Sequence, residues 1–125
     1  GQLPQSAPNL LPLDEAAEAR RAAQNDQNYG AVAPGVLQYT TDLVFRDLWL
    51  RPALAPRDRS LVTVTSLIAS SQVAQIPFHL NRAMGNGLTA DQASETLTQL
   101  SFYIGWPKVF TALPVVKDVL QHRNS

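Results

Sequence analysis

Prolines divide an otherwise helical pattern of apolar residues into short segments, and this division constrains the fold more than any other feature. Proline disfavours the helical conformation at the residue before it but fits the first turn of a helix. Pro52 therefore ends one predicted helix, whereas Pro56, Pro77 and Pro107 each fit the start of another. Apolar residues recur at helical spacing between them, and no strand pair or hairpin turn is recognisable. The pattern predicts an all-α, single-domain helical bundle of about six helices.

Two parts are expected along the chain: an N-terminal arm with a short helix, residues 1–30, and a helical domain, residues 31–125. The first dozen residues mix prolines with Gln, Ser and Asn, which predicts an extended segment without a core of its own. The predicted helices, in chain order, cover 14–24, 36–50, 59–71, 77–85, 90–104 and the residues from 107 onward. Thr89 and Gln92 have the spacing of a capping box at the start of the fifth helix.

Composition excludes several classes of function. The 125 residues are 45% hydrophobic, enough for a real core, but only 16% charged. An ordinary domain has roughly 25% charged residues, so part of the surface is expected to be covered by copies of the same chain. Ten basic and ten acidic residues give no net charge, which argues against a nucleic-acid or anionic-membrane partner. Because cysteine is absent, disulfides and thiol chemistry are excluded, and no apolar run reaches the roughly 18 residues of a membrane span.

The start of the chain bears on its compartment. It lacks an initiator methionine and is rich in Pro and Gln, as in a mature chain trimmed behind a signal peptide. This favours an exported, periplasmic protein over a cytoplasmic one.

His79 is the strongest candidate for chemistry. A helix over residues 77–85 places His79, Arg82 and Asn86 within about 60° of one another, beside an apolar stripe. A neutral imidazole at such an edge can exchange a proton near pH 7, and a guanidinium one turn away can hold a carboxylate. The alternative is a partly buried histidine bonded to a backbone carbonyl.

The other candidate residues each have a structural interpretation beside the functional one. Arg59 ends an Arg-Asp-Arg run that is either a salt-bridge cluster at a helix end or a place where Arg59 binds an anion. Glu95 lies in mid-helix and is either solvated, a general acid or base, or a carboxylate that orients His79 or pairs with an arginine. The aromatic residues around Gly105 are expected to pack in the core or at an interface; they are Phe102, Tyr103 and Trp106. No metal site is expected, because the two histidines are far apart and thiolates are absent.

Five short motifs in a fixed order resemble the carboxymuconolactone decarboxylase family. They are Arg57-Asp58-Arg59-Ser60-Leu61-Val62-Thr63, Phe78-His79-Leu80 with Ala83, Asn86-Gly87-Leu88-Thr89, Glu95-Thr96-Leu97, and Tyr103-Ile104-Gly105-Trp106-Pro107. Each motif is weak alone, but the order and spacing of all five fit, and 36–52 resembles the helix that precedes them in the family. The resemblance implies an all-α fold assembled as a homo-oligomer, a trimer or a hexamer.

The resemblance also implies a cofactor-independent lyase. The alkylhydroperoxidase branch of the family uses a CxxC pair with a nearby histidine, which this cysteine-free chain cannot provide. The cysteine-free branch includes enzymes that decarboxylate 4-carboxymuconolactone, a small carboxylated lactone, in aromatic compound catabolism. The conjugated lactone carbonyl absorbs the electrons that CO2 leaves behind, so no cofactor is expected.

Site residues follow from the resemblance and from the needs of the reaction that it implies. His79 and Glu95 fall on the family's histidine and glutamate and are the expected catalytic residues. Arg59 and Arg82 are expected to hold the substrate carboxylates. An apolar wall around the substrate is expected from Phe78, Met84 and Trp106.

One motif departs from the family pattern. Decarboxylase members often have Glu-Leu-Arg shortly before the histidine, where this chain has Gln75-Ile76-Pro77. A carboxylate and an arginine are both missing there. The alternative to a lyase is therefore a non-catalytic oligomeric relative that binds a small molecule without turnover.

Overall fold

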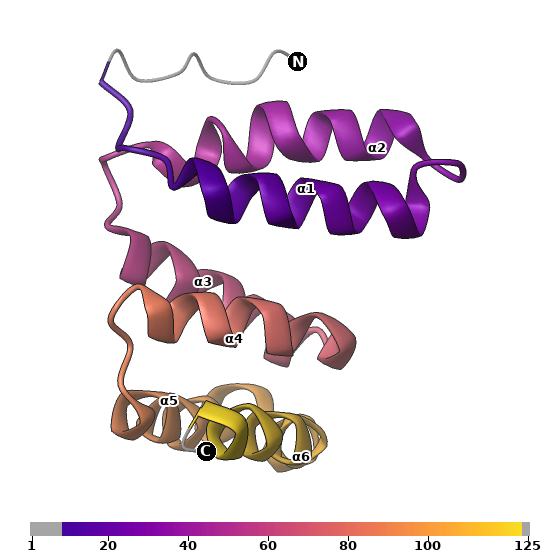
Figure 1. Ribbon diagram of the computed structural model, residues 1–125. Coiled ribbons are helices and arrows are strands. Elements are labelled where there is room, and N and C mark those ends of the chain that lie inside the picture. The colour runs from indigo at the N-terminus through magenta and orange to yellow at the C-terminus, as the bar shows by residue number, and fades with distance from the viewer. Residues whose placement is uncertain (1–8, 124–125) are drawn as a thin grey trace. The chain divides into compact units, whose positions relative to one another are not determined.

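The computed structural model describes residues 9–123, and the chain folds as two compact units, unit 1 (Gly1–Leu54) and unit 2 (Ala55–Ser125) (Figure 1). Within the described range the chain forms six α-helices with short π and 3-10 segments and no strand. The predicted all-α fold is therefore confirmed. Residues 1–8 of the predicted arm, residues 1–30, lie outside the described range, and the domain boundary after residue 30 stays a prediction.

Unit 1 begins with α1 (Glu15–Tyr29), which Asp14 caps by accepting a hydrogen bond from the backbone N–H of Ala17 at 3.1 Å. The helix continues past Gln24, where it was predicted to end. Once a helix is nucleated, each added residue gains a hydrogen bond, so the polar residues after Gln24 continue it despite their weaker helix propensity.

The helix predicted over 36–50 is instead a run of three shorter elements. They are α2 (Pro34–Tyr39), the π-helical segment η1 (Thr40–Phe45) and the 3-10 turn η2 (Leu48–Leu50). At the first junction the Thr40 hydroxyl donates to the Val36 carbonyl at 2.7 Å, a local bond that bends helices. Further on, the backbone N–H of Arg46 donates to the carbonyl of Thr41, the i to i−5 pattern of a π-helix. Apolar spacing predicted the helical character but not this change of helix type.

A buried ion pair ties α1 to η1. Glu18 and Arg21 lie one turn apart on α1, with Arg21 Nε donating to Glu18 Oε2 at 2.9 Å. Arg21 also donates to the Thr41 hydroxyl at 3.0 Å and lies over the Phe45 ring, 4.2 Å from its centroid. Phe45 stacks in turn on Trp49. Breaking a buried pair by removing one partner typically costs about 3–5 kcal/mol, so this cluster is a main support of unit 1.

Unit 2 consists of two helical layers, one of α3 and α4 and the other of α5 and α6 (Figure 1). Its elements are α3 (Pro56–Ala69), the 3-10 turn η3 (Val73–Gln75), α4 (Ile76–Gly85), α5 (Ala90–Ile104) and α6 (Trp106–Arg123). Aliphatic side chains from all four helices meet between the layers, among them Val64, Ile68, Leu80, Leu97 and Val116. This core fixes which sides of α3, α4 and α5 remain accessible.

Two tight turns set the helix order of unit 2. Gly87, with φ of 109°, follows α4, and Thr89 then caps α5. The N–H of Gln92 donates to Thr89 Oγ1 and the N–H of Thr89 donates to Gln92 Oε1, both at 3.0 Å. The predicted capping box is therefore confirmed. Gly105, with φ of 93°, separates α5 from α6, a backbone conformation that favours glycine.

Candidate functional site

Helix α4 buries one side in the core and leaves a polar edge beside it. Ile76, Leu80 and Ala83 recur at helical spacing and are fully buried. His79 and Arg82 lie next to this stripe and are half-buried, which agrees with the border position that helical geometry predicts. We call His79 and Arg82 the α4 edge.

Burial and a neighbouring charge act together on His79. The pKa of His79 is lowered from its ordinary value, first by burial of the imidazole and second by the positive charge of Arg82. The Nδ1 of His79 and the Nε of Arg82 are both buried from solvent. Because both effects penalise a second positive charge, the imidazole is mainly neutral at pH 7. An anion bound at the α4 edge would favour its protonated form.

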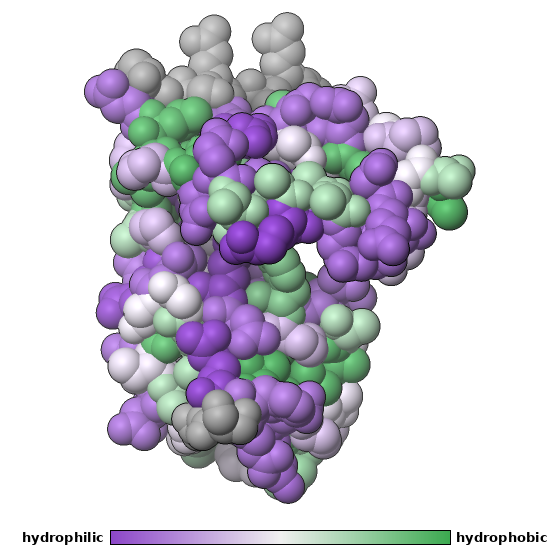
Figure 2. All heavy atoms as spheres, in the orientation of Figure 1, coloured by the Kyte–Doolittle hydropathy of each residue, from purple (hydrophilic) through white to green (hydrophobic). Residues whose placement is uncertain are grey.

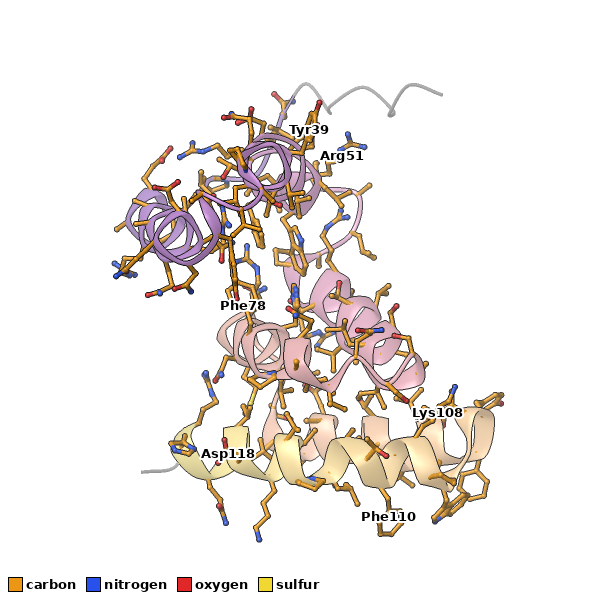
Figure 3. All side chains as sticks on the ribbon, turned by 90° about the vertical axis from the view of Figure 1, so that its right-hand side faces the viewer. Tyr39, Arg51, Phe78, Lys108, Phe110 and Asp118 are labelled. Carbon is orange, nitrogen blue, oxygen red and sulfur yellow. The ribbon has the colours of Figure 1, made fainter. Side chains whose placement is uncertain are left out.

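An aromatic ring adjoins the imidazole. The rings of Phe78 and His79 lie 5.0 Å apart between centroids and are nearly perpendicular, at 84°. Figure 3 shows Phe78 on the side of α4 that faces away from α6. The exposed ring gives His79 an apolar neighbour that a ligand at the α4 edge would also meet.

Arg59 comes from α3, the helix that packs most extensively against α4. Its side chain is half-buried, and its Nε is buried from solvent. The next residue, Ser60, is fully buried, and its hydroxyl accepts a hydrogen bond from Asn86 Nδ2 at 3.1 Å. Arg59 therefore lies near the end of the α3–α4 pair at which α4 terminates.

Glu95 lies in a different part of unit 2. It is exposed on α5 and lines an open groove of about 480 Å³ between α3 and α5. Arg57 lines the same groove from α3, where it also pairs with the adjacent Asp58 at 3.2 Å. The lining includes neither His79 nor Arg82. We call this hollow the Arg57–Glu95 groove.

Met84 and Trp106, the other two predicted wall residues, have different surroundings. Met84 is half-buried and packs against the core of unit 2. Trp106 begins α6, is half exposed, and packs edge-on against Phe102 with 5.1 Å between ring centroids. Among the predicted wall residues, Phe78 is the one with a ring contact to His79.

The sequence left the run that starts at Arg57 open between a helix-end salt-bridge cluster and an anion site at Arg59, and it did not place Arg57 in the groove. Arg57, Leu61 and Thr65 recur every four residues, and all three line the groove from α3. Such spacing places side chains on one face of a helix. That signal was present in the sequence, but the partner face on α5 became apparent only from the packing of the two helices.

Between residues 9 and 123, no group of three or more His, Cys, Asp and Glu side chains is arranged to hold a metal ion. In the same range, no helix combines the length and apolar character needed to cross a membrane.

Comparison with known proteins identifies relatives over more than half of the chain. Residues 34–118 match the sequence model of the carboxymuconolactone decarboxylase family. A 4-carboxymuconolactone decarboxylase from Acinetobacter baylyi is 32% identical over 75 residues, 60% of this chain. A nitrosuccinic acid decarboxylase from Metarhizium robertsii is 26% identical over 80 residues, 64% of this chain. Each alignment covers 56% of the relative's own length, so this chain spans about half of each curated relative.

Proposed function

Because the chain belongs to the carboxymuconolactone decarboxylase family, we propose that it is a carboxy-lyase that removes CO2 from a small, multiply carboxylated compound without a cofactor. The observation that carries the proposal is the α4 edge, where a half-buried imidazole of lowered pKa lies one turn from a guanidinium. Such a pair combines a proton carrier with an anion holder, which are the two functions this reaction demands of the protein.

The proposed decarboxylation requires few functions of the protein. The bond between the substrate carbon and its carboxylate breaks, CO2 leaves, and the electron pair moves into a conjugated lactone carbonyl of the substrate. The resulting enolate then takes one proton at carbon. The protein has to hold the remaining carboxylate, exclude water from the departing one and return that proton.

We assign the proton to His79 and the substrate carboxylate to Arg82, with Arg59 as a second anion holder. The free imidazole is mainly neutral at pH 7, because burial and Arg82 lower its pKa. A bound carboxylate adds the opposite charge and raises that pKa, so substrate binding itself loads the proton donor. Phe78 provides an apolar neighbour for the step in which charge leaves the carboxylate.

Glu95 receives no step in this proposal. The predicted role of Glu95 as the residue that orients His79 stays a prediction. Its exposed carboxylate lies in the Arg57–Glu95 groove, whose lining does not include His79.

The names of the two relatives support the reaction class and suggest two substrates. Both relatives are named as decarboxylases of carboxylated small molecules. In 4-carboxymuconolactone the electron sink is the conjugated lactone, and in nitrosuccinic acid it is a nitro group on the carbon that bears the carboxylate. Neither reaction calls for a sink supplied by the protein, which fits a site made of cations and a proton carrier.

The test is turnover of both substrates, with the lactone followed by its ultraviolet absorbance and nitrosuccinate by CO2 release. General acid–base catalysis typically contributes about 10²–10⁴-fold, so His79→Ala should lower kcat/KM by at least about a hundredfold. The matched control is His122→Ala, which removes the other histidine, an exposed side chain near the end of α6. Turnover that is unchanged in His79→Ala removes His79 from the mechanism.

A second candidate, a non-catalytic small-molecule-binding protein, is favoured by one observation. Gln75-Ile76-Pro77 stands before Phe78 and His79, where decarboxylase members often have a charged motif, and it forms the junction of η3 with α4. Saturable binding of a dicarboxylate that Arg82→Ala abolishes, with no turnover of either substrate, would favour this binding protein over the lyase.

A further inference from the structure

The side chain of Asn86 joins the end of α4 to the start of α3. Its Nδ2 donates to the hydroxyl of Ser60 at 3.1 Å and, at a longer 3.5 Å, to the carbonyl of Pro56. Ser60 is fully buried, whereas Asn86 itself is exposed. The two helices run antiparallel, so these bonds lie at the end of the pair where α3 begins and α4 terminates (Figure 1). We call the two side-chain bonds the Asn86 clamp.

The Asn86 clamp is connected to both arginines that are proposed to hold the substrate. On α4, the backbone N–H of Asn86 donates to the carbonyl of Arg82 at 2.9 Å. On α3, Ser60 directly follows Arg59, whose own N–H donates to the carbonyl of Ala55 at 2.8 Å and so belongs to the regular start of the helix. One asparagine therefore links the backbone segments that carry the two guanidiniums.

The apolar core holds the α3–α4 pair further along its length. Val64, Ile68 and Leu80 are almost fully buried there, one helical turn or more from Ser60 and Asn86. Outside that core, hydrophilic residues are interspersed with hydrophobic ones on the face of unit 2 that Figure 2 shows. The spacing of the two helices at their outer end therefore depends on polar bonds, and the Asn86 clamp makes such bonds from α4 to a buried hydroxyl of α3.

That spacing affects how a charged substrate is held. The Nε atoms of Arg59 and Arg82 are buried from solvent, and partly buried charges are screened less than exposed ones, so two guanidiniums at one site repel each other. A compound with two carboxylates can bond to both guanidiniums only when their separation matches its own. A compound with one carboxylate needs only one of them. The separation of the arginines therefore decides how strongly a dicarboxylate is preferred over a monocarboxylate.

We infer that Asn86 is a positioning residue that sets the spacing of Arg59 and Arg82, and with it the preference of the site for dicarboxylates. The inference rests on the proposed function, because it takes these two arginines as the anion holders. Asn86 acts through α3 and has no contact with the substrate in this account. Its loss should therefore reduce discrimination between ligands more than it reduces anion binding in general.

The test measures dissociation constants of succinate and acetate from the NMR signals of the His79 imidazole. Asn86→Ala removes the Asn86 clamp but keeps the backbone N–H that bonds to the Arg82 carbonyl. It should weaken succinate binding by about threefold to tenfold, the effect of one hydrogen bond, and acetate binding by less than about twofold. The matched control is Asn81→Ala, an exposed asparagine of the same helix whose amide donates within α4, to the Pro77 carbonyl at 2.9 Å. Both dissociation constants should stay at their wild-type values in the control.

A double-substitution cycle links the effect to the bond with Ser60. Ser60→Ala removes the buried acceptor of that bond, so it should also weaken succinate binding more than acetate binding. If the two residues act through one bond, the double variant loses little more succinate affinity than Asn86→Ala alone. Additive losses in the double variant would overturn the inference.

The remaining outcomes separate this inference from the proposed function. Succinate binding that Arg82→Ala abolishes and Asn86→Ala leaves unchanged overturns the inference alone. Equal weakening of succinate and acetate in Asn86→Ala also overturns it, because a general loosening of the fold has that effect. A wild-type chain whose imidazole signals respond to neither anion overturns the proposed anion site and the inference together.

Discussion

The α4 edge and the Arg57–Glu95 groove both place an arginine in the neighbourhood of a residue that can carry a proton, yet their surroundings differ. His79 and Arg82 are half-buried, and burial acts with the charge of Arg82 to lower the pKa of His79. Arg57 and Glu95 are exposed on an open groove, and Arg57 already pairs with its neighbour Asp58. Water screens such exposed charges, whereas partly buried ones keep most of their interaction.

The comparison teaches that residue type is a poor guide to a site unless burial is known. The groove is an open hollow of about 480 Å³ and contains a carboxylate that fits the family pattern. At the α4 edge, burial and the charge of Arg82 lower the pKa of His79, and perturbed pKa values of this kind cluster at functional sites. Substitutions in each region can therefore separate a reacting site from a solvated groove.

The largest difference in kcat/KM between the two regions is expected from Arg82→Ala. Removal of a charged hydrogen-bond partner of a bound carboxylate should lower kcat/KM by about a hundredfold, with part of the loss restored by Arg82→Lys. The matched substitution in the other region is Arg57→Ala, read in the same steady-state assay. Equal losses in Arg57→Ala and Arg82→Ala would remove the distinction between the two regions.

The second largest effect is expected in the pH dependence of kcat/KM and kcat, which only the α4 edge should cause. The proton donor works in its protonated form, so kcat/KM should fall about tenfold per pH unit above the lowered pKa of His79 in the free protein. A bound carboxylate raises that pKa, so the fall of kcat should begin at higher pH than the fall of kcat/KM.

Rate profiles between pH 5 and pH 9 test this ordering, with His122→Ala as the control that should leave both curves in place. A kcat/KM that instead rises through the same range would assign His79 the role of a base.

The smallest effect is expected from Glu95→Gln. Its carboxylate is exposed and lies in a groove that does not include His79, so kcat/KM should change by less than about threefold, as for a screened surface charge. Steady-state rates with both substrates provide the check. A loss approaching that of His79→Ala would restore Glu95 as the partner that orients the imidazole.

Local features of unit 2 were predictable because they depend on residues close in sequence. The α5 capping box needs only Thr89 and Gln92, and the position of His79 beside the apolar stripe of α4 follows from helical periodicity. The features that the sequence did not reveal depend on packing between distant segments. The groove that joins Arg57 to Glu95 requires α3 to lie along α5. Burial of Glu18 with Arg21 requires η1 to cover α1. In unit 1, the change from α-helix to a π segment at Thr40 is a further feature that apolar spacing alone does not encode.

The central claim is that His79 is a partly buried proton carrier whose pKa responds to an anion held by Arg82. Its most direct test is an NMR titration of the two histidine imidazoles, with His122→Ala assigning the signals. His122 is exposed near the end of α6 and serves as an internal reference. In the free protein His79 should titrate below its ordinary pKa, and a non-reactive dicarboxylate should raise that pKa in wild type but not in Arg82→Ala. A His79 pKa at or above the ordinary value of about 6.5, unmoved by the dicarboxylate, would contradict the account.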